Sequence, residues 1–240
     1  MMMLRSWLYL IFLGLSTVFY TIKILVITPW QPFAARSKIA NQWGLANMLA
    51  LKILCKLDYK VTGIENLPDK NCIVIANHQS AWETIALRGI MPPEQTWVLK
   101  RELLSIPFFG WALQAVQPIT IDRDAGIKAL KKLITQGADA LHQGRWVMIF
   151  PEGTRVRLGE HKKYNIGGAM LAEKTGYPIL PIAHNAGTFW PRQGIRKNQG
   201  TIQVVIGPML ITEGKTAGQI NAEVETWIRK QTEVVLKSIT

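Results

Sequence analysis

The residues with the clearest catalytic potential are His78 and Glu83, in the segment Asn77-His78-Gln79-Ser80-Ala81-Trp82-Glu83-Thr84. An imidazole with a carboxylate in reach is the minimal apparatus for removing a proton from a hydroxyl near neutral pH. The sequence has no Gly-x-Ser-x-Gly, His-Glu-x-x-His, Gly-x-x-x-x-Gly-Lys or Cys-x-x-Cys motif that would indicate a different reaction. The pair therefore predicts a general base, and the rest of the chain must indicate its target.

The local sequence restricts how these two side chains can meet. Residues 72–76 form an apolar strand pattern, and His78 follows at its carboxyl end, where open α/β sheets place their ligands. Residues 81–87 are typical of a helix, and five helical positions turn a side chain by about 500°, roughly 140° away from the same face. Contact therefore requires His78 to lie in the corner before the helix. The alternative is a core histidine beside a solvated Glu83.

A second candidate segment is the loop Pro151-Glu152-Gly153-Thr154-Arg155, which follows an apolar strand at 146–150. Glycine allows close backbone approach, threonine supplies a hydroxyl, and arginine has a planar fork suited to phosphate oxygens. The alternative is an ordinary turn.

Lys100 and Arg101 also follow a predicted strand and precede an aromatic segment interrupted by Pro107. They are cations at a strand end, where ligands bind, and the alternative is a solvated cation pair. The aromatic residues of that segment have core packing as their alternative.

The pattern of the remaining chain predicts an α/β domain with a mostly parallel, mixed sheet flanked by helices. Amphipathic helices are expected from Ile127 to Leu141, from Gly168 to Thr175 and from Thr216 to Lys237. Short apolar runs predict strands at 59–63, 72–76, 96–100, 118–121, 146–150, 179–183 and 201–206.

The N-terminal segment predicts attachment to a membrane. Residues 6–22 carry no charge, and a helix of that length spans about 25 Å, against roughly 30 Å for a hydrocarbon core. If Lys23 snorkels, the apolar stretch reaches Trp30. A spanning helix is the first interpretation, and a membrane-embedded hairpin broken at Pro29 is the second. A cleaved signal peptide fits poorly, because 33–35 make a poor cleavage site.

Domain boundaries and orientation follow from the same region. We expect residues 1–58 to form the anchor and helical connector, and residues 59–240 to form the catalytic domain. Arg36 and Lys38 follow the apolar stretch whereas only Arg5 precedes it, so the positive-inside rule places the catalytic domain on the cytoplasmic face, which is the inner membrane in a bacterium.

The net charge of +12, from 28 Lys and Arg against 16 Asp and Glu, predicts anionic partners. The basic residues are scattered, and a nucleic-acid module would leave the apolar N-terminus unexplained, so we expect no nucleic-acid partner. Cys55 and Cys72 are expected to be reduced core residues. The histidines at 142, 161 and 184 lack the spacing of metal ligands, so no metal site is predicted.

Taken together, these segments resemble the lysophosphatidic acid acyltransferases, a family within the glycerophospholipid acyltransferases. The resemblance covers roughly residues 70–185. It rests on His78 with an acid five positions later, on the segment from Lys100 to Gly110, on Phe150-Pro151-Glu152-Gly153-Thr154-Arg155, and on the proline-flanked run 177–183. The family usually has aspartate at the position of Glu83, and the extra methylene adds about 1.5 Å of stem.

The resemblance implies a reaction. His78 would take the proton of a lysophospholipid hydroxyl while Glu83 orients the imidazole, and the hydroxyl would attack the carbonyl of an acyl thioester. Lys100, Arg101 and Arg155 would bind the acceptor phosphate, with Glu152, Gly153 and Thr154 shaping the loop. Arg123 is a further candidate. Phe108, Phe109 and Trp111 would either line a path for the acyl chain or contact lipid, and the alternative is that they pack in the core.

The implied partners are membrane lipids, the lysophospholipid acceptor, and acyl-coenzyme A or acyl carrier protein as the donor. No cofactor is implied beyond that co-substrate. The main alternatives are another lysolipid or glycerol phosphate as the acceptor, or a non-catalytic lipid-binding protein.

Overall fold

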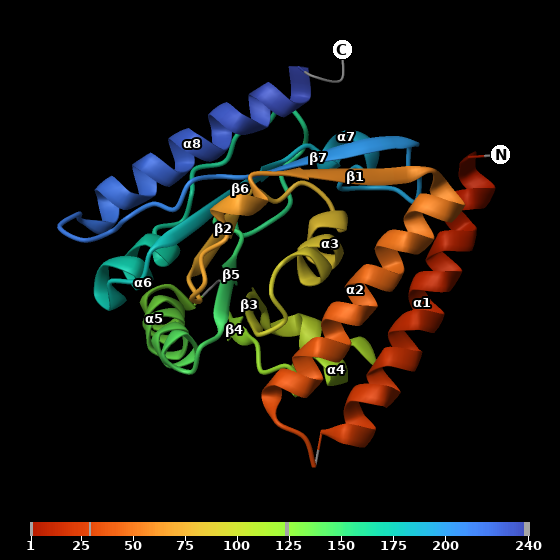
Figure 1. Cartoon of the computed structure of the whole chain (residues 1–240), viewed down its shortest axis with the longest axis horizontal. Coiled ribbons are helices and arrows are strands. Elements are labelled where there is room, and N and C mark those ends of the chain that lie inside the picture. The colour runs from red at the N-terminus through yellow and green to blue at the C-terminus, as the bar shows by residue number, and fades with distance from the viewer. Residues whose placement is uncertain (1, 29, 123–124, 238–240) are drawn as a thin grey trace.

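The protein is built on one seven-stranded mixed sheet with helices on both faces, as predicted (Figure 1). The computed structural model describes residues 2–28, 30–122 and 125–237. The strand order is β1-β7-β6-β2-β5-β3-β4, and every neighbouring pair is parallel except β6 with β7. The strands are Leu57–Thr62 (β1), Ile73–Ala76 (β2), Gln95–Lys100 (β3), Ile119–Ile121 (β4), Trp146–Ile149 (β5), Ile179–His184 (β6) and Gly200–Ile206 (β7).

All seven predicted strands are confirmed, and the central strand shows why they could be recognised. In β2, Val74 and Ala76 pack with one hydrophobic cluster while Ile73 and Ile75 pack with the other. Because both faces are covered, every residue of β2 is buried, and the strand has the continuous apolar run that is typical of parallel sheets.

Helices α2 (Phe33–Cys55) and α3 (Trp82–Ile90) cover one face of the sheet, and α5 (Ile127–His142), α6 (Gly167–Thr175) and α8 (Ala217–Lys237) cover the other. The three amphipathic helices of the second face are confirmed to within one residue of their predicted starts. The short helices α4 (Phe109–Ala115), α7 (Ala186–Phe189), η1 (Ile64–Asn66) and η2 (Arg101–Ser105) were not predicted.

The N-terminal segment forms α1 (Met2–Ile27), which packs against α2 over much of its length (Figure 1). Tyr9 of α1 and Leu51 of α2 are both fully buried in the same hydrophobic cluster as β2 and α3. By its length and composition, helix α1 is long and apolar enough to cross a membrane. Pro29, the predicted break, lies outside the described residues.

Candidate active site

The corner between β2 and α3 holds His78 in the place that the helix geometry required. Strand β2 ends at Ala76 and α3 begins at Trp82, so His78 precedes the first helical turn. The preceding Asn77 anchors this corner to β6, because its side-chain amide donates to the His184 carbonyl at 2.9 Å and its Oδ1 accepts from the His184 N–H at 3.0 Å. The corner is therefore fixed to the neighbouring strand.

His78 and Glu83 are in direct contact, with His78 Nδ1 2.8 Å from Glu83 Oε1. The same carboxylate oxygen accepts the backbone N–H groups of Gln79 and Ser80, each at 2.8 Å. Burial alone would raise the pKa of the fully buried Glu83 carboxyl, but the imidazoles of His184 and His78 and the N–H of Ser80 outweigh it and hold the pKa below its ordinary value. Glu83 is therefore ionised, and it holds the proton of His78 on Nδ1.

The other imidazole nitrogen of His78 is available for chemistry. The side chain is 13% exposed and lines a cavity, and its ring stacks on Phe150 with centroids 4.3 Å apart. Since Nδ1 is bound to Glu83, Nε2 is the nitrogen without a proton and can accept one from a bound hydroxyl. The glutamate in place of aspartate does not prevent the contact.

Glu152 contacts His78 but does not line the cavity. Its Oε2 accepts the backbone N–H of His78 at 2.9 Å. Burial, with a smaller contribution from the charge of Glu83, raises the pKa of the Glu152 carboxyl to about 8. The sequence predicts that Glu152 shapes the loop. In the structure its carboxyl has a more specific role, because it holds the backbone of His78 in position.

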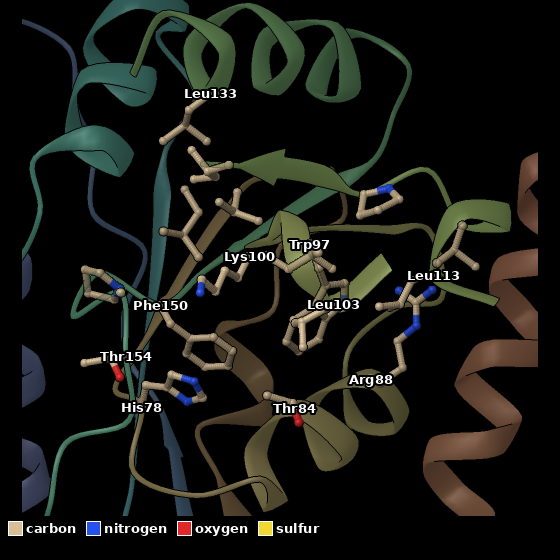
Figure 2. A pocket seen from close by; sticks show the side chains of 18 of the residues that line it. His78, Thr84, Arg88, Trp97, Lys100, Leu103, Leu113, Leu133, Phe150 and Thr154 are labelled. Carbon is tan, nitrogen blue, oxygen red and sulfur yellow. The ribbon is translucent and has the colours of Figure 1, made fainter. Parts of the chain in front are cut away.

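The cavity beside the dyad has a volume of about 700 Å³ and a predominantly apolar lining. Figure 2 shows His78, Phe150 and Thr154 close together, with Leu133 beyond them in one direction and Arg88 with Leu113 in another. Six residues of the N-terminal helices also line it, namely Thr17, Tyr20, Thr21, Ile24, Ala40 and Trp43. A cavity of this kind can hold an alkyl chain with its polar end at His78.

Besides Arg88 of α3, the same cavity is lined by the basic side chains of Lys100 at the end of β3 and of Arg155 and Lys162 in the loop after β5. Lys100 is 45% exposed and pairs with Glu102 at 2.8 Å. Arg101 is exposed and does not line the cavity, although it is the neighbour of Lys100. Arg123 lies outside the described residues.

The loop after β5 brings its main chain close to the cavity. Gly153 lines it with φ +66°, a conformation that favours glycine, and an added Cβ would lie 3.1 Å from the Asn165 side-chain nitrogen. Asn165 in turn donates to the Pro151 carbonyl at 2.8 Å and so closes the loop. Thr154 also lines the cavity beside His78 (Figure 2).

Comparison with known proteins agrees with this geometry. The Acyltransferase family model matches residues 58–185. A 1-acyl-sn-glycerol-3-phosphate acyltransferase of Pseudomonas aeruginosa is 43% identical over 229 residues, covering 94% of this chain and 89% of that protein. The chain belongs to the 1-acyl-sn-glycerol-3-phosphate acyltransferase family. A yeast enzyme of that name, from Saccharomyces cerevisiae, is 33% identical over 204 residues, covering 82% of this chain and 67% of its own.

The fold of the family is also present. The crystal structure of the 1-acyl-sn-glycerophosphate (LPA) acyltransferase PlsC from Thermotoga maritima superimposes with a TM-score of 0.81 at 25% identity, and the match covers 97% of this chain and 95% of that one. The resemblance inferred from the motifs is therefore confirmed.

In this member of the acyltransferase family, several residues of the site were not predicted. Thr84 and Arg88 project from the same side of α3 into the cavity (Figure 2), and their i, i+4 spacing directly after the dyad was an available signal. The sequence predicts no role for His184, which lacks the spacing of a metal ligand. In the structure it is fully buried and its Nε2 lies 2.8 Å from the Asn77 carbonyl, so it supports the dyad corner.

The aromatic segment at 108–111 divides between two surroundings. Phe109 lines the cavity, whereas Phe108 and Trp111 are exposed and contact each other with ring centroids 4.9 Å apart.

Among the described residues no group of three or more His, Cys, Asp and Glu side chains could hold a metal ion. The expectation of a reaction without a metal or a tightly bound cofactor stays a prediction.

Proposed function

We propose that the protein transfers a fatty acyl group from a thioester to the free hydroxyl of 1-acyl-glycerol-3-phosphate, giving phosphatidic acid. The observation that carries the proposal is the ionised, fully buried Glu83 bound to Nδ1 of a cavity-lining His78. This arrangement leaves Nε2 as a base beside a cavity suited to alkyl chains. Membership of the family and the names of the relatives support the same substrates.

The proposed chemistry is a direct transfer without an acyl-enzyme. His78 Nε2 takes the hydroxyl proton as the oxygen attacks the thioester carbonyl, and Glu83 stabilises the imidazolium that forms. When the tetrahedral intermediate collapses, the C–S bond breaks, the new ester remains, and the thiolate takes the proton back from His78. A thiol has a pKa near 8.5, so the leaving group needs little acid assistance.

The acceptor phosphate would bind to Lys100 and Arg155, with Thr154 and the Gly153 backbone beside them. Arginine can hold two phosphate oxygens at once, whereas lysine acts as a point charge. Arg101 takes no part in this proposal because it does not line the cavity. We expect coenzyme A or acyl carrier protein to carry the donor thioester, and no cofactor beyond that co-substrate.

We further propose that the α1–α2 hairpin, within the anchor region 1–58, lies on the membrane while 59–240 carries the chemistry. Helix α1 exposes apolar side chains at helical spacing along one side, among them Ile11, Leu15 and Phe19 at 57%, 67% and 62%. Its opposite side is buried against the protein. A spanning α1 would have to give up this packing, and so the hairpin interpretation is favoured. We expect the catalytic domain to lie on the cytoplasmic face of the membrane, as the basic residues after α1 indicate.

The test is an acyl-transfer assay with purified protein in phospholipid nanodiscs. Palmitoyl-coenzyme A and palmitoyl carrier protein would each be offered to 1-acyl-glycerol-3-phosphate, to other lysophospholipids and to glycerol phosphate. His78→Ala should abolish transfer, whereas His161→Ala, which removes an exposed histidine, should not. Efficient transfer to a different lysolipid, with little to 1-acyl-glycerol-3-phosphate, would refute the acceptor. Full activity of His78→Ala would refute the mechanism.

A further inference from the structure

A second, smaller cavity lies at the amino ends of the strands, whereas His78 follows the carboxyl end of β2. It has a volume of about 220 Å³ and sits where β3 and β4 begin and just before β5. Its lining is mostly polar, and it shares only Pro118 with the cavity of the dyad. The proposed acyl transfer uses none of its residues, which are Thr96, Gln117, Pro118, Ile119, Gln136, Asp139, Ala140, Gln143 and Arg145.

Arg145 lines this cavity and forms no ion pair among the described residues. Burial together with the nearby charge of Arg36 lowers the pKa of Arg145. Arg36 also forms no ion pair within the ranges that the structure describes, and its buried Nε has no hydrogen-bond partner there. Like charges held together in a partly buried place destabilise the empty protein and favour an anion.

The Arg145 side chain is held in place by stacking, since its guanidinium carbon lies 3.8 Å above the Phe33 ring. The last carbonyl groups of α5 do not need the guanidinium of Arg145 as a hydrogen-bond donor. The carbonyls of Asp139, Ala140 and Leu141 accept the backbone N–H groups of Gln143, Arg145 and Gly144 instead. The fork of the guanidinium is thus left for a ligand.

A third group points to the same kind of ligand. Thr96 is 1% exposed and lines the cavity, yet its hydroxyl has no partner among the described residues. An unpaired buried hydroxyl costs free energy unless something bound satisfies it. A hydroxyl donor beside a guanidinium is a common pairing for a phosphate group.

We propose that this cavity is a second, non-catalytic site for a phosphate group, held by Arg145 and Thr96, with the positive charge of Arg36 nearby. The ligand is either free phosphate or the phosphate of a lipid headgroup. The hairpin end at Phe33 brings the site near the proposed membrane face, which makes a headgroup accessible. Asp139 also lines the cavity and its carboxylate opposes an anion, so its removal should tighten binding.

The experiment measures the thermal stabilisation of the full chain in detergent by inorganic phosphate, at ionic strength held constant with chloride. The Arg155→Gln protein is the background, so that phosphate bound at the proposed acceptor site does not contribute. Arg145→Gln should weaken binding roughly tenfold or more, as expected for a lost charge-assisted hydrogen bond. Arg192→Gln, an equal charge change at an exposed arginine, should not.

Thr96→Val keeps the variant folded while testing the site, since it removes only an unpaired hydroxyl. We expect unchanged or higher stability without phosphate and several-fold weaker binding with it, whereas Asp139→Asn should bind more tightly. Nanodiscs of phosphatidylglycerol, compared with those of a phosphate-free galactolipid, distinguish the source, because a headgroup ligand would stabilise only in the former. If inorganic phosphate and phosphatidylglycerol stabilise Arg145→Gln and Thr96→Val as much as they stabilise Arg192→Gln, the proposed phosphate site is refuted. The proposed acyl transfer would not be affected by that result.

Discussion

The backbone N–H of His78 donates to the Glu152 carboxyl at 2.9 Å, across 74 positions of sequence. This bond joins the loop after β2 to the loop after β5, whose strands are neighbours in the sheet. The two motifs that could be recognised in the sequence are therefore parts of one rigid unit. Glu83 fixes the imidazole of His78 while Glu152 fixes its main chain.

Glu152 should make the protein less stable as pH rises. Its carboxyl has an ordinary pKa of 4.5 in the unfolded chain and a pKa of about 8 when folded. Between these values the folded state keeps a proton that the unfolded state has lost, so the free energy of unfolding falls with pH by at most about 1.4 kcal/mol per unit.

Glu152→Gln removes this titration and should flatten the decline between pH 5 and 8, as measured by urea unfolding in detergent. Glu160→Gln changes an exposed glutamate in the neighbouring loop and should keep the wild-type slope. If Glu152→Gln keeps that slope as well, the buried carboxyl of Glu152 titrates near its ordinary pKa and does not cause the decline.

Replacing Glu83 with Asp should slow the reaction even though the charge is kept. Shortening the stem by about 1.5 Å withdraws the oxygen that now accepts from His78, Gln79 and Ser80. A displacement of this size costs on the order of 100-fold in kcat. Single-turnover assays would measure it, with Glu65→Asp as a conservative control at an exposed site. A wild-type rate would mean that the site tolerates either acid.

Lys100 and Arg101 offer a matched pair of adjacent cations. Lys100 lines the cavity and Arg101 does not, so Lys100→Ala should raise KM for the phosphate-bearing acceptor by about tenfold with little change in kcat. Arg101→Ala should leave KM within about twofold at 0.15 M salt, where exposed charges are screened. Steady-state kinetics with varied acceptor decides this, and equal effects of the two changes would mean that only the general surface charge matters.

Leu133→Phe should shift the preferred acyl chain to a shorter length. Leu133 is buried in α5 and lines the cavity, and a Cβ added at Gly167 would lie only 2.7 Å from its Cδ2, so there is no free space on that side of the side chain. A larger ring must therefore take volume from the cavity. Ile127→Phe adds a ring at a 73% exposed position of the same helix and is the control. Competition among thioesters of different chain length measures the shift, and an unchanged profile would place the chain elsewhere.

Much of this protein could be read from local patterns. Strands buried on both faces are continuous apolar runs, and helices packed on one side repeat every three to four residues, so the seven strands and the larger helices were predictable. The corner position of His78 also followed from helical geometry alone. The short helices carry little periodicity. Helix α4 in particular follows Phe108, whose φ is +60°, and sequence spacing does not indicate such a backbone conformation.

Sequence by itself determined the dyad, the loop from Pro151 to Arg155 and the family, because these depend on residue types at short, fixed spacing. Only the tertiary structure decided that Glu152 faces the His78 backbone, that His184 supports Asn77, and that Lys100 rather than Arg101 reaches the cavity. Those contacts join distant segments, and they depend on β2 lying between β5 and β6. Strand order is set by the packing of the whole sheet, and no local pattern in the chain encodes it.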